Sequence, residues 1–109
     1  MMLDQQEFQL RSDEALRKLY KALAQASDEY GFDTDFGGAL TIEFDDPPAK
    51  FVVSPNAPVA QVWVSAHMKS YKLNWDPARE EFVLPESGQS LQTLVREAVS
   101  QQLGEEVTL

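Results

Sequence analysis

Apolar and polar residues alternate along several short segments in the middle of the chain. In QVWVSA, residues 61–66, small apolar residues take every second place, with a glutamine, a tryptophan and a serine between them. Successive side chains of a strand point to opposite faces, so this pattern predicts a strand with one face in a core and one toward water. ALTIEF (39–44) and YKLNW (71–75) show the same alternation. A sheet buried on both faces would instead show continuous apolar runs.

A different spacing flanks these strands. In residues 4–27 and 90–104 apolar residues recur three and four places apart, which predicts one amphipathic helix at each end of the series. Asp4 and Glu7 stand at capping-box spacing at the start of the first helix. Ser90 is the expected N-cap of the second, and Gly104 fits its C-terminal cap.

Turn residues divide residues 30–84 into about six short strands, and Gly37-Gly38 is expected to form a two-residue hairpin turn. The connections are too short for parallel crossovers, so the sheet should be antiparallel. Two helices with one apolar stripe each are most simply laid on one face of it. The sequence therefore predicts an α+β fold, a two-layer sandwich with strand order along the chain (αββββββα), as a single domain over residues 1–109.

This arrangement leaves one sheet face open, and Trp63 should stand on it with Gln61, Ser65, Lys72 and Asn74. Tryptophan is prominent among the residues that dominate protein–protein contacts. The open face is thus a candidate protein-binding surface. The alternative is that loops partly cover Trp63, which then only supports the sheet.

Charge narrows the range of partners. The chain has 18 acidic and 9 basic residues, a net charge of −9. Such a protein repels nucleic acid and anionic membranes and attracts cations or basic protein surfaces, so we expect no nucleic-acid or membrane partner. The charged N-terminal segment does not resemble a signal peptide, and we expect a soluble, cytoplasmic protein, monomeric in solution.

Residues 28–46 hold seven acids and no base, and they supply the candidate metal ligands Asp28, Glu29, Asp33 and Asp35. Carboxylates suit hard cations such as Fe³⁺ and, more weakly, Fe²⁺ or Mg²⁺. An open cluster of this kind should bind with a Kd on the order of 10⁻⁵ to 10⁻³ M. The alternatives are a solvated acidic face and an acidic surface that meets a basic partner.

The residues give little support for catalysis. The chain has no cysteine, and its one histidine, His67, is expected to be structural. No nucleophile with a partner base is indicated, and no two carboxylates are placed across a predicted cleft. We therefore expect a protein that is not an enzyme.

The segment PVAQVWVS, residues 58–65, resembles the sheet signature of the frataxin family, whose pattern is P-x-x-Q-[IV]-W-[LV]. GGALTIEF, KLNWD and SGQSLQTLVREAV resemble the family's hairpin, next aromatic strand and second helix, in the same order. The resemblance covers nearly the whole chain, and the short form is similar to the bacterial members.

This resemblance implies an iron-binding accessory protein of iron–sulfur cluster assembly, which docks on the cysteine desulfurase and scaffold protein. The alternative within the family is an iron-storage or iron-delivery protein with weak carboxylate sites, binding Fe²⁺ or Fe³⁺. The chain departs from the family pattern on the first helix, where Lys18 and Lys21 stand in a region that is usually acidic. The residues expected to contact the partner are Asn56, Gln61, Trp63, Ser65, Lys72 and Asn74.

Overall fold

The first helix, α1 (Gln5–Tyr30), begins and ends with side-chain and backbone caps. The side chain of Asp4 accepts a hydrogen bond from the backbone N–H of Glu7 at 2.8 Å, as the capping-box spacing predicts. The helix stops at Gly31, which takes the left-handed conformation (φ 74°) and donates its N–H to the carbonyl of Ser27. The computed structural model describes residues 3–45 and 47–109, and α1 ends within the segment ASDEYG, residues 26–31, where the sequence predicts that it should fade.

Six antiparallel strands follow in the order of the sequence, which confirms the predicted meander. The prediction of a two-residue turn at Gly37-Gly38 is wrong. Gly37 is already paired with Ala39, and of the two glycines only Gly38 has a positive φ, 83°. The strands are β1 (Asp33–Gly37), β2 (Ala39–Asp45), β3 (Pro48–Asn56), β4 (Gln61–Ala66), β5 (Lys69–Asp76) and β6 (Glu81–Val83), with a short 3-10 turn, η1 (Ala57–Val59), before β4.

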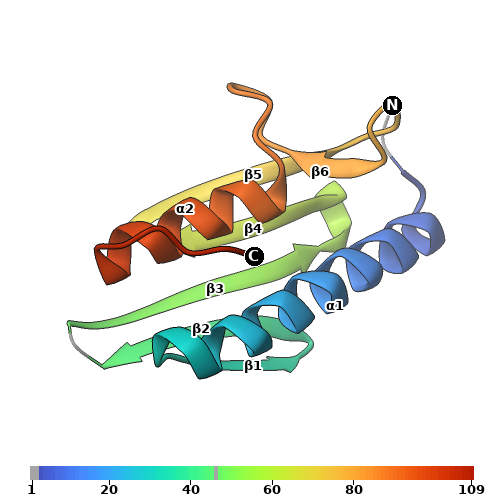
Figure 1. Ribbon diagram of the computed structural model, residues 1–109. Coiled ribbons are helices and arrows are strands. Elements are labelled where there is room, and N and C mark those ends of the chain that lie inside the picture. Colours follow the sequence, from blue (N-terminus) through green and yellow to red (C-terminus); the bar gives the residue numbers. More distant parts are fainter. Residues whose placement is uncertain (1–2, 46) are drawn as a thin grey trace.

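The second helix, α2 (Leu91–Leu103), lies with α1 on one face of the sheet, α1 in front of β1–β3 and α2 in front of β4 and β5 (Figure 1). Ser90 caps its start by accepting from the N–H of Thr93 at 3.2 Å, and Gly104 (φ 72°) ends it. The chain then turns back toward the space between the helices (Figure 1), where Val107 is buried. The two-layer α+β sandwich predicted from the sequence is confirmed.

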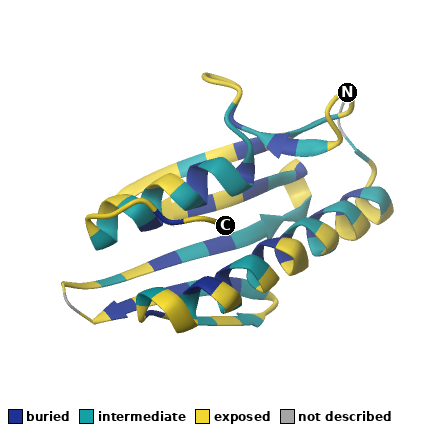
Figure 2. Ribbon diagram, in the orientation of Figure 1, coloured by how far each residue is buried: buried dark blue, intermediate teal, exposed yellow. Residues whose placement is uncertain are grey.

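The core fills the space between the sheet and the helices. Buried and exposed positions alternate along the strands (Figure 2), and the buried set faces the helices: Leu40, Ile42, Phe44, Phe51, Val53, Val62, Val64, Ala66, Leu73 and Phe82. The helices contribute Phe8, Leu16, Leu19, Leu23, Leu91, Leu94, Val95 and Val99. Within the described residues, neither helix has the length and hydropathy needed to cross a membrane.

Candidate functional site

The face of the sheet opposite the helices carries a continuous polar surface around one tryptophan. On β4, Val62 and Val64 are buried under the helices, whereas Trp63 between them is 36% exposed. In the antiparallel register Trp63 lies directly opposite Lys72 of β5 and Ser54 of β3. Directly opposed residues share a face, so all three side chains lie on the uncovered side of the sheet. Trp63 therefore stands where the strand alternation predicted it.

Neighbouring side chains hold the indole of Trp63 in one orientation. Its Nε1–H donates to Oε1 of Gln61 at 2.9 Å, and Nε2 of Gln61 in turn donates to Oδ1 of Asn74 at 3.0 Å. The Lys72 ammonium lies 4.9 Å from the centre of the indole ring, at cation–π distance. Gln61 and Lys72 contact the ring directly, and Asn74 holds Gln61 in place, so the ring loses little conformational freedom when it contacts a partner. We call these four residues, Gln61, Trp63, Lys72 and Asn74, the tryptophan patch.

The other two predicted contact residues border this patch. Asn56 pairs with Gln61 at the end of β3, and the exposed Ser65 follows Trp63 on the same face of β4. All six residues predicted for partner contact thus come together on one surface. Their binding role remains a prediction.

The acidic residues of β1 extend the same open face toward one edge of the sheet. Asp33 lies opposite Glu43 of β2, and Asp35 lies opposite Thr41. Glu43 is exposed, whereas its neighbours Ile42 and Phe44 are buried against the helices, so Asp33 and Asp35 face solvent on the uncovered side. We call Asp33, Asp35 and Glu43 the acidic edge.

The structure does not bring the four candidate metal ligands together at one point. Asp28 and Glu29 belong to the last turn of α1, in the helix layer, whereas Asp33 and Asp35 face away from that layer. In residues 3–45 and 47–109 no group of three or more histidine, aspartate or glutamate side chains is placed to hold a metal ion. Hard cations need several oxygen ligands around one point, so these residues do not fit a resident iron centre.

His67 has a structural environment, in line with the expectation from its isolation in the sequence. Its Nε2 lies 3.0 Å from the carbonyl oxygen of Ala98 in α2, and its ring packs edge-on against Phe51 at 4.9 Å. The side chain therefore ties the β4–β5 hairpin to the second helix.

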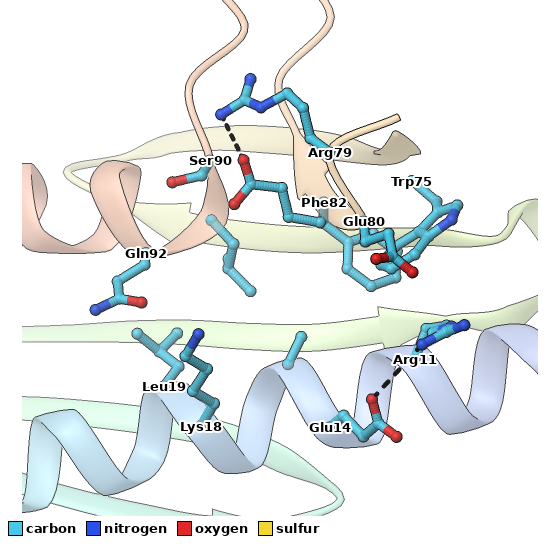
Figure 3. A pocket seen from close by; sticks show the side chains of 13 residues that line it. Arg11, Glu14, Lys18, Leu19, Trp75, Arg79, Glu80, Phe82, Ser90 and Gln92 are labelled. Atoms are coloured by element: carbon cyan, nitrogen blue, oxygen red, sulfur yellow. Dashed lines mark ion pairs between the residues drawn. The ribbon is translucent and has the colours of Figure 1, made fainter. Parts of the chain in front are cut away.

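Sequence reasoning missed a pocket on the helix side of the molecule. A cavity of about 340 Å³ opens between α1, the β5–β6 hairpin and the start of α2. Charged side chains from distant segments line it, among them Arg11, Lys18, Arg79 and Glu80 (Figure 3). The one available signal was the seven-residue spacing of Arg11 and Lys18, two turns apart on one side of a helix.

Comparisons with known proteins agree with this architecture. The family model of the frataxin-like domain matches residues 1–105. The iron-sulfur cluster assembly protein CyaY of Dechloromonas aromatica (strain RCB) is 31% identical over 109 residues, covering 98% of this chain and 99% of that protein. The solved structure of the frataxin from Psychromonas ingrahamii superposes with a TM-score of 0.75 at 23% identity, covering 96% of both chains. The chain is therefore a member of the frataxin family.

Proposed function

We propose that this protein is a non-catalytic accessory factor of iron–sulfur cluster assembly, acting in the cytoplasm, and that its open sheet face docks on the cysteine desulfurase and scaffold protein. The pathway is suggested by the relative from Dechloromonas aromatica, which is an iron-sulfur cluster assembly protein. The choice of surface rests on the structure of this chain.

The observation that carries the proposal is the exposed and immobilised indole of Trp63. The ring is 36% exposed on a face that neither helix covers, and its N–H is already bonded to Gln61. Its internal bond leaves no unsatisfied donor to be desolvated when a partner covers it. Pre-organised aromatic residues of this kind dominate the energetics of many protein interfaces.

The acidic edge gives the same face a charge that complements a basic partner. Asp33, Asp35 and Glu43 lie on it, and of these three, among the described residues, Glu43 forms an ion pair, with Lys50 at 3.9 Å. Acidic surfaces accelerate encounter with basic ones and orient the complex before close contact forms. In this proposal the acidic edge governs the association rate, and the tryptophan patch governs the lifetime of the complex.

In this proposal iron binds weakly to the acidic edge. Two or three carboxylates on an open strand bind divalent cations with little selectivity, because they leave most of the coordination shell to water. In anaerobic NMR titrations, paramagnetic Fe²⁺ should therefore broaden the amide signals of residues 33, 35 and 43, and diamagnetic Mg²⁺ should shift the same signals over a similar concentration range. A tight response confined to iron would contradict weak binding.

Exchange of Trp63 for arginine tests the docking surface. Trp63→Arg should weaken binding to the purified desulfurase–scaffold complex about 30-fold or more, as for an interface hot spot of 2 kcal/mol. Leu10→Arg is the matched control, since Leu10 is an apolar residue of α1 that is 52% exposed. Biolayer interferometry measures both affinities, and thermal unfolding checks that both variants stay folded. Wild-type affinity of a folded Trp63→Arg protein would contradict the proposed surface.

A further inference from the structure

The pocket between α1, the β5–β6 hairpin and the start of α2 has the size of a small-ligand site. Its volume of about 340 Å³ is within the range of roughly 300–1,000 Å³ that is usual for such sites. It opens on the helix side of the sheet, so it is separate from the tryptophan patch. A ligand bound there would leave the proposed docking face free.

The charges that line the pocket leave one cation and one anion available. Arg11 forms an ion pair with Glu14 at 3.9 Å, and Arg79 forms a second one with Glu81 at 2.5 Å, so these four charges already have partners. Lys18 and Glu80 also line the pocket, and neither forms an ion pair with any residue in 3–45 or 47–109. Lys18 belongs to the α1 wall and Glu80 to the β5–β6 wall (Figure 3).

The turn that carries Glu80 has a defined conformation. Oδ1 of Asp76 accepts from the N–H groups of Ala78 at 3.0 Å and Arg79 at 3.4 Å. Glu80 follows with φ 53°, in the left-handed region that glutamate rarely occupies. Because Arg79 is also bonded to the carbonyl of Gly88 at 2.6 Å, the turn is tied to the segment before α2. The carboxylate of Glu80 is therefore presented from a fixed backbone.

Trp75, Phe82 and Leu19 supply apolar parts of the pocket lining. Trp75 packs against Phe82 in a T-shaped arrangement with ring centres 5.2 Å apart, and Arg11 lies 5.3 Å above the Trp75 ring. Leu19 completes the apolar lining. At the Lys18 side, Gln92 from the first turn of α2 offers an amide donor (Figure 3), and that turn contains no acidic residue. The pocket thus presents a cation, an apolar wall and an anion.

We propose that this pocket binds a small linear zwitterion of the ω-amino carboxylate class. The ligand's carboxylate pairs with Lys18 and Gln92, its ammonium pairs with Glu80, and its methylene chain packs on the half-buried Trp75. A simple anion would leave Glu80 without a partner and a simple cation would leave Lys18 without one. Lys18 and Glu80 are both exposed, so selectivity comes from the second charge pair, which only a ligand with two opposite charges can form.

Three probes of equal chain length test this proposal: 6-aminohexanoate, hexanoate and hexylamine. In ¹⁵N NMR titrations 6-aminohexanoate should shift the Trp75 indole signal and the amides of residues 18 and 80 saturably, with a Kd on the order of 1 mM. Hexanoate and hexylamine should each bind at least about tenfold more weakly, since each lacks one charge pair. Equal affinity for all three probes, or no saturable shift, would overturn the proposal.

Two charge-removing variants locate the contacts. Lys18→Gln and Glu80→Gln should each weaken 6-aminohexanoate binding about five- to tenfold, and Lys18→Gln should leave hexylamine binding undiminished. Lys21→Gln and Glu86→Gln are the controls, because both residues are exposed and lie outside the pocket lining. Losses of equal size in the controls would show that binding follows net charge and would overturn the assignment.

Discussion

Replacement of Met68 by glycine should stabilise this protein, although it removes a whole side chain. Met68 and His67 form the two-residue loop between β4 and β5, where Ala66 pairs with Lys69. Both loop residues are in the left-handed region, with φ 62° for Met68 and 52° for His67. Such a hairpin loop favours asparagine and glycine, which adopt this conformation at low cost. Met68 is fully exposed, so loss of its side chain removes no buried surface.

The expected gain is the difference between two terms. Release of a side chain from the left-handed conformation gives back about 1–2 kcal/mol. Glycine has a larger conformational entropy in the unfolded chain, which costs about 0.4–1 kcal/mol. The net stabilisation is then about 0.5–1 kcal/mol, or a rise in Tm of roughly 2–6 °C for a domain of this size.

Urea unfolding followed by circular dichroism measures this difference, with Met68→Ala as the matched control. Alanine removes the same exposed atoms beyond Cβ but keeps the strained conformation, so it should leave the unfolding midpoint nearly unchanged. His67→Gly relieves the same kind of strain yet should destabilise, because it also loses the contacts of the ring with Phe51 and Ala98. A Met68→Gly protein no more stable than Met68→Ala would refute the reasoning.

Two further predictions concern the sheet edge and the C-terminal segment. Asp33→Lys should raise the free energy of unfolding by about 0.5–1 kcal/mol in low salt, because it turns a like-charge pair with Glu43 into an opposite one. Urea midpoints should also show that added NaCl or Mg²⁺ stabilises the wild type more than this variant. Equal salt responses of the two proteins would contradict repulsion at the acidic edge. Val107→Ala should lower the free energy of unfolding by about 1–2 kcal/mol, since Val107 is 2% exposed and the substitution removes two buried carbons. Thr108→Ala is the control, because Thr108 is exposed. Equal urea midpoints for the two variants would refute packing of the C-terminal segment.

The sequence was sufficient for the fold and for the tryptophan patch because both depend on local periodicity. Alternation in QVWVSA determines which side of β4 faces the helices, and the two valines on either side of Trp63 leave the indole only the open side. Caps at Asp4, Ser90 and Gly104 are equally local, and all three are present. In both cases the signal and its consequence lie within a few residues of each other.

The candidate metal site could not be predicted in this way, because residues that are close in sequence can belong to different layers of the fold. Asp28 and Asp33 are five residues apart, but the helix ends between them and the chain passes at Gly31 into the edge strand. The first residue then lies in the helix layer, and the second faces away from it. A run of acids across such a boundary is divided between two surfaces, whatever its charge density.

The pocket was beyond sequence reasoning for the opposite reason, since its walls come from residues far apart in the chain. Lys18 and Glu80 are brought together because α1 and the β5–β6 hairpin pack on the same core. Strand β5 shows how one segment serves both surfaces: Lys72 and Asn74 point to the open face, while Leu73 is buried between the layers and Trp75 lines the pocket. Because alternate side chains of one strand face opposite sides, the docking surface and the pocket share a backbone without sharing a contact. A partner that covers Trp63 and a ligand that contacts Trp75 are therefore sterically compatible.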